Sequence, residues 1–406
     1  MKILIICQLF PPEYAPIGIM IKELADDLTV KGHNVTVVTG FPNHPHGILF
    51  PDYKKSLFNM ERVAGITLIR CYLYTSPKKT FFRRLLTYLT FAVFSFIAVM
   101  RLERQDVLFI VSPPLTNGLI ALAIKKLKDL NFVFNVQDIY PDVAISTGVI
   151  KNQLLIQFLK KLELKIYDAA SSIAVISEGF KKNLIIKGVS VSKIRVIYNW
   201  IDTNEITLIH KDNKFARKYG LTNKFVILYS GTIGMISGAD ILLDCAEKLV
   251  YMKDILFLFV GEGIVKERIK EDAEKRQLKN VQFLPFQPRE ILSDVQSSAD
   301  VSVVTLLKGK GKTSVPSKVL GYMAAARPVV ASVDSDSDTR IMIEKADCGI
   351  CVDAEDAQGL TEAIIQLYND RNRAETLGRN GRNYLVLSCD RKTITAQYEE
   401  LFLSVK

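Results

Sequence analysis

The residues best suited to chemistry lie in the second half of the chain, where glycine-rich turns follow strand-like apolar runs. The first run ends at Gly231 and continues past Gly234 into a helical pattern, and the second ends in Gly261, Glu262 and Gly263. Turns of this kind at the carboxyl ends of parallel strands bind phosphates, because the helices that follow them present free N–H groups. The pattern predicts a nucleotide-binding half.

The elements that must position these turns alternate along the whole chain. The runs at 108–112, 132–138 and 172–177 are almost continuously apolar, as expected for parallel strands buried on both faces. The pattern restarts at Phe225 after a polar stretch, 204–224, which we interpret as a hinge. We predict an α/β protein with two doubly wound, Rossmann-like domains and with ligands in a cleft at the strand carboxyl ends. The expected divisions are 1–203, 204–380 and a C-terminal helical segment, 381–406.

Length and charge agree with this organisation. The chain has 406 residues, 49% of them hydrophobic and 24% charged, which suits two globular domains of about 200 residues each. Its net charge of +10 indicates an anionic partner, such as a nucleotide phosphate, a nucleic acid or an acidic membrane surface. No zinc spacing and no ribonucleoprotein signature stands out, so we expect no nucleic-acid partner.

The cysteines and the first residues predict a cytoplasmic protein. Five of the six cysteines lie among apolar neighbours, which indicates buried free thiols. Cys348 and Cys351 have C-x-x-C spacing but precede a strand rather than a helix, so a redox or metal role is not favoured. Residues 1–10 read as a strand and not as a signal peptide, because only Lys2 precedes the apolar run and no cleavage site follows.

One apolar segment, Leu85–Met100, has two interpretations. It is shorter than the ~20 residues that span a bilayer, so the preferred interpretation is a buried helix of the first domain. The alternative is an interfacial helix whose basic flanks meet anionic lipid headgroups. These flanking residues are Lys78, Lys79, Arg83, Arg84, Arg101 and Arg104.

Motifs spread along the chain carry a family resemblance. They are Pro11-Pro12-Glu13, Gly18, Lys31-Gly32-His33, Phe41-Pro42-Asn43, residues 136–142 and 196–202, Gly231–Gly234, and residues 261–263, 316–318 and 322–332. In order and spacing they resemble the retaining, nucleotide-sugar-dependent glycosyltransferases of family 4. The closest branch is typified by colanic-acid and O-antigen transferases of the L-fucosamine type. The resemblance implies the GT-B fold, with C-terminal helices that cross back to the first domain.

In the first half, the resemblance implies a polar site at the end of one predicted strand. Gly18 would let the backbone approach the donor diphosphate and the acceptor. Gln137 and Asp138 stand where many relatives have His-Asp beside the transferred sugar, although the Gln137 amide cannot change charge. Asp138 could instead cap the following helix. The catalytic residues predicted in this way are Gln137, Asp138 and Lys318.

In the second half, the resemblance implies a donor site. Backbone N–H groups at Gly231 and Gly234 would meet the diphosphate, and Glu262 and the loop that begins at Phe286 would lie near the nucleotide. Phosphate would also meet the N–H groups, hydroxyl and ammonium at Ser317 and Lys318. The predicted donor-binding residues are Gly18, Gly231, Gly234, Glu262, Gly263, Phe286, Thr313, Pro316, Ser317 and Lys318.

The chain departs from the family pattern at two places. Most members have two glutamates eight positions apart, the first for sugar hydroxyls and the second for the ribose, and here these positions are Thr313 and Gly321. Relatives usually place a cation just after the G-x-x-G turn, where this chain has the uncharged Met235. We therefore expect Lys318 to supply the countercharge for the diphosphate, helped by another basic residue of the same stretch. The candidates are Lys308, Lys310 and Lys312, and the alternative is a flexible basic loop.

The function implied is a retaining, metal-independent transfer of a sugar from a nucleotide diphosphate, with UDP favoured. The acceptor would be a polyprenyl-diphosphate-linked saccharide in surface polysaccharide biosynthesis, and the enzyme would be peripheral on the inner face of the plasma membrane. No cofactor is expected, and the H-x-H spacing of His44 and His46 lacks a third metal ligand. Two alternatives remain: a non-catalytic nucleotide-sugar-binding partner in an assembly complex, and a sugar-nucleotide epimerase.

Overall fold

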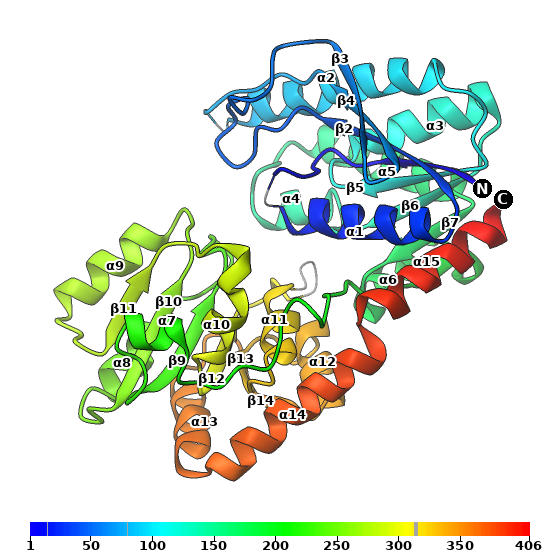
Figure 1. Ribbon diagram of the computed structural model, residues 1–406. Helices are drawn as coiled ribbons and strands as arrows, with labels where there is room; N and C mark the ends of the chain where they lie inside the picture. Colours follow the sequence, from blue (N-terminus) through cyan, green and yellow to red (C-terminus); the bar gives the residue numbers. More distant parts are fainter. Residues whose placement is uncertain (14, 79, 312–315) are drawn as a thin grey trace. The chain divides into compact units, whose positions relative to one another are not determined.

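The computed structural model describes residues 1–13, 15–78, 80–311 and 316–406 (Figure 1). The described chain divides into two compact units. Unit 1 comprises Met1–Asn199 and Lys392–Lys406, and unit 2 comprises Trp200–Arg391. The polypeptide therefore passes between the units twice, once in each direction.

Within the described residues, unit 1 is built on an eight-stranded sheet in the order β3-β4-β2-β1-β5-β6-β7-β8. All neighbouring strands pair in parallel except β3 and β4, which pair antiparallel at one edge. The strands are β1 (Lys2–Ile6), β2 (Asn34–Gly40), β3 (Phe58–Val63), β4 (Ile66–Cys71), β5 (Val107–Ser112), β6 (Phe132–Val136), β7 (Ser172–Val175) and β8 (Ile194–Val196). Every residue of β5, β6 and β7 is buried, which confirms the prediction from their continuous apolar runs.

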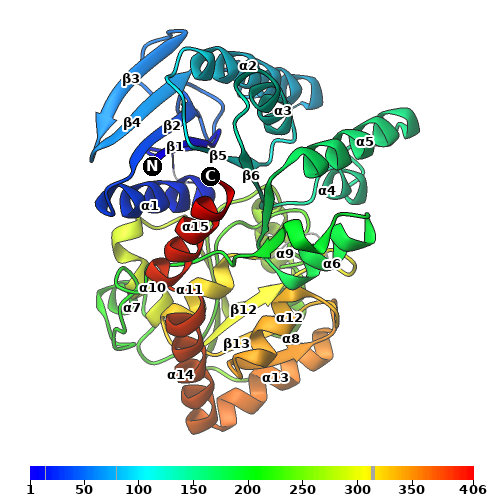
Figure 2. The same cartoon turned by 90° about the vertical axis from the view of Figure 1, so that its right-hand side faces the viewer.

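Helices cover both faces of this sheet (Figure 2). Three of them, α2, α3 and α5, pack in sequence on one another. On another part of the sheet, α15 packs its Tyr398 and Phe402 rings on Phe109 of β5 and bonds α1 through Thr395 and Asp27. The helices of unit 1 are α1 (Pro16–Val30), α2 (Phe81–Met100), α3 (Thr116–Lys128), α4 (Asp142–Ser146), α5 (Gln153–Ala169), α6 (Glu178–Ile186) and, from Lys392 onward, α15 (Arg391–Val405), with a 3₁₀ turn η1 (Val191–Lys193).

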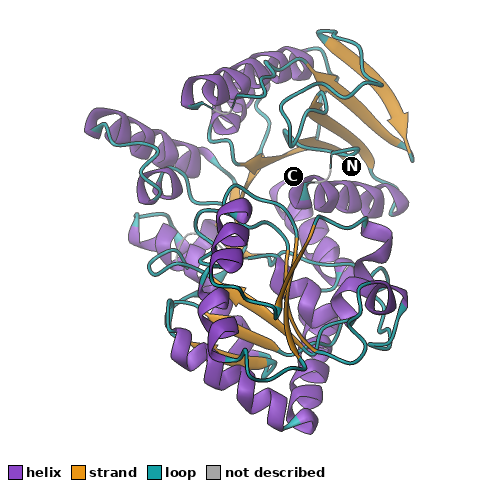
Figure 3. Ribbon diagram, turned by 90° about the vertical axis from the view of Figure 1, so that its left-hand side faces the viewer, coloured by secondary structure: helices purple, strands orange, loops and turns teal. Residues whose placement is uncertain are grey.

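Unit 2 has a wholly parallel sheet in the order β11-β10-β9-β12-β13-β14, with helices on both of its faces (Figure 3). Its strands are β9 (Phe225–Ser230), β10 (Ile255–Val260), β11 (Val281–Leu284), β12 (Val301–Thr305), β13 (Val329–Ser332) and β14 (Gly349–Val352). Its helices are α7 (Lys214–Lys218), α8 (Ile241–Lys248), α9 (Lys266–Lys275), α10 (Leu292–Ser297), α11 (Lys318–Ala324), α12 (Asp338–Lys345), α13 (Ala357–Asn369) and α14 (Arg371–Ser388), with a 3₁₀ turn η2 (Arg289–Ile291). The parallel order with central β9 confirms the second Rossmann-like domain.

The division between the units differs from the expected boundaries. The sequence placed the first domain at 1–203 and the C-terminal segment at 381–406, whereas the structure divides the chain after Asn199 and Arg391. The stretch 204–224, expected to be a hinge, lies within unit 2, where Asn213 caps α7 and bonds the carbonyl of Asp294. The chain also returns to unit 1 later than expected, because α14 continues to Ser388 and packs on α11 of unit 2.

Two expected elements change in the structure. Gly18 was assigned to a loop but lies in α1, which begins at Pro16, because proline is well suited to the first position of a helix. The apolar segment forms α2, but its preferred interpretation as a buried helix is wrong. Phe82 is 79% exposed and Val93 is 54% exposed, and only 22% of the most apolar stretch of α2 is buried within the structure.

Candidate functional site

Asp138 is a carboxylate without a countercharge at the end of β6. It follows Val136 at the carboxyl edge of the unit 1 sheet, and it has no hydrogen-bond or ion-pair partner in the part of the chain that the structure describes. Burial raises the pKa of Asp138 from 3.8 to about 6, because the charged form loses water without gaining a partner. A carboxylate in this state is available to a ligand.

Gln137 is held by its neighbours on both sides. Its amide nitrogen donates to Asn135 Oδ1 at 2.9 Å, and its amide oxygen accepts from Asn199 Nδ2 at 2.9 Å. These bonds fix the orientation of the amide beside Asp138, so Gln137 has less freedom to reach a sugar hydroxyl than the sequence implied. Its geometry fits a positioning role as well as direct contact.

Electrostatic effects on two tyrosines connect the surroundings of Asp138 with the start of α2. Burial raises the pKa of Tyr140 to about 12, with further contributions from Tyr88 and Asp138, while the Arg84 guanidinium opposes this shift. Burial also raises the pKa of Tyr88, again opposed by Arg84. These effects require proximity, so the start of α2 lies within electrostatic range of the loop that carries Asp138.

The loop after β1 is organised by a buried carboxylate. Glu13 is 1% exposed, and its Oε1 accepts the backbone N–H groups of Asn43 and His44, each at 2.8 Å. Gly18 allows α1 to pack closely on this loop, since a Cβ atom at this position would lie 2.9 Å from Leu9 O. Its small size therefore lets α1 approach the loop.

In unit 2, the first two glycine-rich turns pack backbone to backbone. A Cβ at Gly263 would lie 2.1 Å from Ile233 O, and one at Gly261 would lie 1.9 Å from Gly231 O. In contrast, a Cβ at Gly234 would meet nothing closer than Thr232 at 3.9 Å. The sequence could not distinguish these two settings: Gly263 allows the turns to meet, whereas Gly234 has room for a Cβ atom.

Lys318 brings an unpaired cation to these turns. Its Nζ lies 3.5 Å from the centroid of the Tyr229 ring, and its Cε would lie 3.5 Å from a Cβ at Gly231. No carboxylate pairs with it among the described residues, and burial lowers the pKa of Lys318 from 10.5 to about 7. The ammonium is thus a half-buried anion site.

Glu262 is paired with a residue that the sequence interpretation overlooked. Lys266, which is 7% exposed, donates to Glu262 Oε1 at 2.7 Å and lies 3.5 Å from Leu284 O. The carboxylate itself remains half exposed at the end of β10. The i, i+4 spacing of the two residues at the start of a helix was the available signal.

The remaining predicted donor residues differ in their settings. Phe286 is 54% exposed in the loop after β11, and Ser317 is exposed immediately before Lys318. Pro316, which precedes Ser317 in the sequence, is half-buried, whereas Thr313 and Lys312 lie outside the described residues. Gly321 is buried, and a Cβ there would lie 3.6 Å from Gln296 Nε2.

The basic stretch before Lys318 is partly ordered by a carboxylate. Asp334 accepts the N–H groups of Gly309 at 2.9 Å and Gly311 at 3.1 Å, which fixes the turn that carries Lys308 and Lys310. Lys308 is exposed. The described part of this stretch is therefore a fixed turn. Of its described lysines, Lys318 is placed at the glycine turns.

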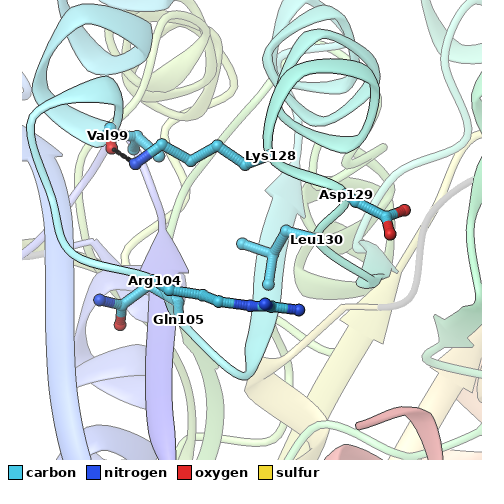
Figure 4. Close-up of a pocket in the computed structure, with 6 residues that line it drawn as sticks. All are labelled: Val99, Arg104, Gln105, Lys128, Asp129 and Leu130. Carbon is cyan, nitrogen blue, oxygen red and sulfur yellow. Dashed lines mark hydrogen bonds between the residues drawn. The ribbon is translucent and has the colours of Figure 1, made fainter.

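A pocket of about 350 Å³ in unit 1 lies away from these residues (Figure 4). It opens between the ends of α2 and α3, before β5 and β6 begin, and therefore at the edge of the sheet opposite Asp138. Lys128 at its rim donates to the carbonyls of Val99 and Leu102. The lining residues are Val99, Arg104, Gln105, Lys128, Asp129 and Leu130. Because Lys128 is occupied by helix carbonyls, we assign this pocket no role in the site.

Sequence comparison gives two family matches and several relatives. Residues 17–205 match the Glycosyltransferase Family 4 model, and residues 211–384 match that for Glycosyl transferases group 1. The chain is 28% identical over 377 residues to a putative colanic acid biosynthesis glycosyl transferase, WcaI, of Escherichia coli K12, covering 90% of this chain and 92% of that protein. It is 24% identical to the probable glycosyltransferase WbjE of Pseudomonas aeruginosa, over 68% and 69% of the two chains.

Solved structures share the fold over the full length. Sucrose-phosphate synthase from Thermosynechococcus elongatus matches with a TM-score of 0.77 and 16% identity, covering 99% of this chain and 98% of that one. Anabaena Alr3699/HepE in complex with UDP-glucose matches with a TM-score of 0.73 and 16% identity, covering 100% of both chains. At these identities the likeness concerns the fold.

Proposed function

We infer that this chain, which is a glycosyltransferase with the GT-B fold, transfers a sugar from a nucleotide diphosphate donor in polysaccharide biosynthesis. The donor proposed is a UDP-sugar, and the acceptor is a polyprenyl-diphosphate-linked saccharide. The observation that carries this proposal is the ammonium of Lys318 beside Gly231, which no carboxylate among the described residues neutralises.

Unit 2 supplies what a diphosphate needs. A half-buried cation without a carboxylate partner is costly unless a ligand neutralises it, and the open space at Gly234 admits a ligand to the same turn. Lys318 also compensates for the uncharged Met235, since its side chain reaches the glycine turn at Gly231. UDP is favoured by resemblance, and Anabaena HepE, a protein of the same fold, was solved with UDP.

The proposed mechanism uses electrostatics and positioning. Positive charge develops at the anomeric carbon as the bond to the diphosphate breaks, while negative charge grows on the leaving phosphate. Lys318 stabilises the leaving group, and its charge makes a metal ion unnecessary for this purpose. The leaving phosphate accepts the acceptor's proton, which permits transfer with retention of configuration.

Asp138 acts on the sugar side of the reaction. Above a pH of about 6 it is an ionised carboxylate with no partner in the described part of the chain, suited to bind a sugar hydroxyl and to stabilise nearby positive charge. Gln137 holds the loop through Asn135 and Asn199. We therefore assign Asp138 a catalytic role. Gln137 has a positioning role, because its amide fixes the loop next to Asp138.

The acceptor side is proposed from α2. Within the described residues, α2 is long and apolar enough to cross a membrane, but it packs along one side on α3 of unit 1. Its exposed apolar residues and basic flanks fit an interfacial helix on an anionic membrane, on the inner face of the plasma membrane. A lipid-linked acceptor would be presented there.

A non-catalytic, nucleotide-sugar-binding role is the second candidate. Gly321 lacks the carboxylate that the family resemblance assigns to the ribose, and Gln296 packs against the place where its side chain would begin. A protein that binds the donor but neither hydrolyses nor transfers its sugar would fit this alternative.

The test combines binding and turnover. Thermal shifts with UDP, GDP, ADP and their sugar conjugates, with and without EDTA, identify the base, since a ligand at a hundred times its Kd adds about 2.7 kcal/mol of stability. Release of nucleotide diphosphate is then measured for wild type, Lys318→Ala and the matched Lys308→Ala control. We expect EDTA to have no effect and Lys318→Ala alone to lose binding and turnover. Intact turnover in Lys318→Ala contradicts the proposed donor site.

A further inference from the structure

The start of α2 lies at the edge of the sheet that carries Asp138. β4 and β6 both run parallel to the other main strands, so α2, which follows β4, begins at the same carboxyl edge where β6 ends. Thr87 Oγ1 donates to Tyr74 O at 2.8 Å, and Tyr74 N donates to Thr90 Oγ1 at 2.8 Å. These bonds fix the first turns of the helix beside the loop after β4.

Arg84 is an exposed cation in these first turns. In the part of the chain that the structure describes, its guanidinium has neither an ion pair nor a side-chain hydrogen bond. It lies close enough to Tyr88 and Tyr140 to affect both hydroxyls, and Tyr140 is two residues from Asp138. The nearby Arg83 differs, because its Nη1 donates to Ser76 Oγ at 2.7 Å.

The opposite face of α2 is apolar and exposed. At about 100° per residue, Phe82, Leu86, Leu89 and Val93 share one stripe, and Arg84 lies on the other side of the helix. These four side chains are 79%, 43%, 43% and 54% exposed. The helix contains no acidic residue, so nothing on it opposes an anion at its start.

Across the start of α2 the order is therefore the apolar stripe on one side of the helix, Arg84 on the other side, and then the loop that carries Asp138. A polyprenyl-diphosphate-linked sugar has the same order of parts: an apolar chain, a diphosphate and a saccharide. Arginine suits the diphosphate, because its planar fork of donors matches phosphate oxygens with two hydrogen bonds.

We propose that Arg84 binds the diphosphate of the lipid-linked acceptor, with the prenyl chain along the exposed stripe of α2 and the acceptor sugar directed toward Asp138. This inference rests on the proposed function, and it assigns Arg84 a role in binding the acceptor.

Binding and transfer are measured separately with a water-soluble probe. Equilibrium dialysis with radiolabelled farnesyl diphosphate is performed under saturating UDP, which occupies the donor site at Lys318. The proteins are wild type, Arg84→Gln, Arg84→Lys and Arg62→Gln, the last an exposed arginine on the edge strand β3. The same proteins are assayed for donor hydrolysis without acceptor and for transfer to a short-chain prenyl-diphosphate sugar.

We expect Arg84→Gln to weaken farnesyl diphosphate binding about tenfold and to raise the KM for the acceptor to a similar extent, with donor hydrolysis unchanged. Arg84→Lys should retain part of the affinity, and Arg62→Gln all of it. Equal binding by wild type and Arg84→Gln, or no binding by wild type, overturns the proposal. Binding that depends on Arg84 without any transfer or hydrolysis contradicts the proposed function instead, so the two failures are distinguishable.

Discussion

If Lys318 binds the donor diphosphate as proposed, donor binding depends on pH with a sign that follows from the surroundings of Lys318. Burial lowers its pKa from 10.5 to about 7, because no carboxylate stabilises the ammonium. A bound diphosphate provides that partner and raises the pKa, so binding takes up a proton. At pH 7 about half of the free protein has a neutral Lys318, and uptake should approach ~0.5 proton per UDP.

Above pH 7 the association constant for UDP should fall about tenfold per pH unit, since the neutral amine of Lys318 does not attract the diphosphate as the ammonium does. Isothermal titration calorimetry between pH 7 and 9, in two buffers of different ionisation enthalpy, measures both the affinity and the proton uptake. Lys318→Arg stays charged throughout and should show a flat profile, whereas Lys308→Gln should behave as wild type. A wild-type profile as flat as that of Lys318→Arg would refute the reasoning.

The lowered pKa of Lys318 also predicts that the stability of the free protein depends on pH. The pKa of Lys318 is lower in the folded than in the unfolded chain, so between pH 7 and 10.5 the unfolded state binds more protons. The contribution of Lys318 to the free energy of unfolding should therefore rise with pH across this window. The substitution Lys318→Met should remove that rise. Urea titrations at several pH values provide the measurement, and parallel curves for both proteins would contradict the assignment.

Three further outcomes are expected. Asp138→Asn should lower kcat by roughly a hundredfold and abolish the loss of rate as pH falls through about 6, as pH–rate profiles would show. Gly263→Ala should lower the free energy of unfolding by about 2–4 kcal/mol through its clash with Ile233 O, whereas Gly234→Ala should change it by less than about 0.5 kcal/mol and weaken UDP binding. Lys266→Met should raise the KM for the donor more than it lowers kcat, because Glu262 loses its hydrogen bond from Lys266. Steady-state kinetics would check this, with Lys270→Met on the same helix as the control.

The sequence by itself determined the repeating βαβ architecture. Buried parallel strands require continuous apolar runs, so β5, β6 and β7 were visible as strands without any contact information. The glycine turns at 231–234 and 261–263 were equally visible, because few residues other than glycine permit such close backbone approach. The unit boundaries were less accurate, since helix α14 packs on unit 2 by contacts between residues distant in sequence.

The roles within the site depended on the tertiary structure. Sequence patterns located Asp138 and Lys318, but their lack of partners, and hence their shifted pKa values, depends on which charges the fold leaves out of reach. Exposure likewise decided α2, whose composition favoured a buried helix but also allowed an interfacial one. Local sequence fixes which residues form strands and turns, whereas burial and charge pairing arise from segments far apart in the chain. Only the folded structure could therefore distinguish Gly263 from Gly234 and bring Arg84 within electrostatic range of Tyr140.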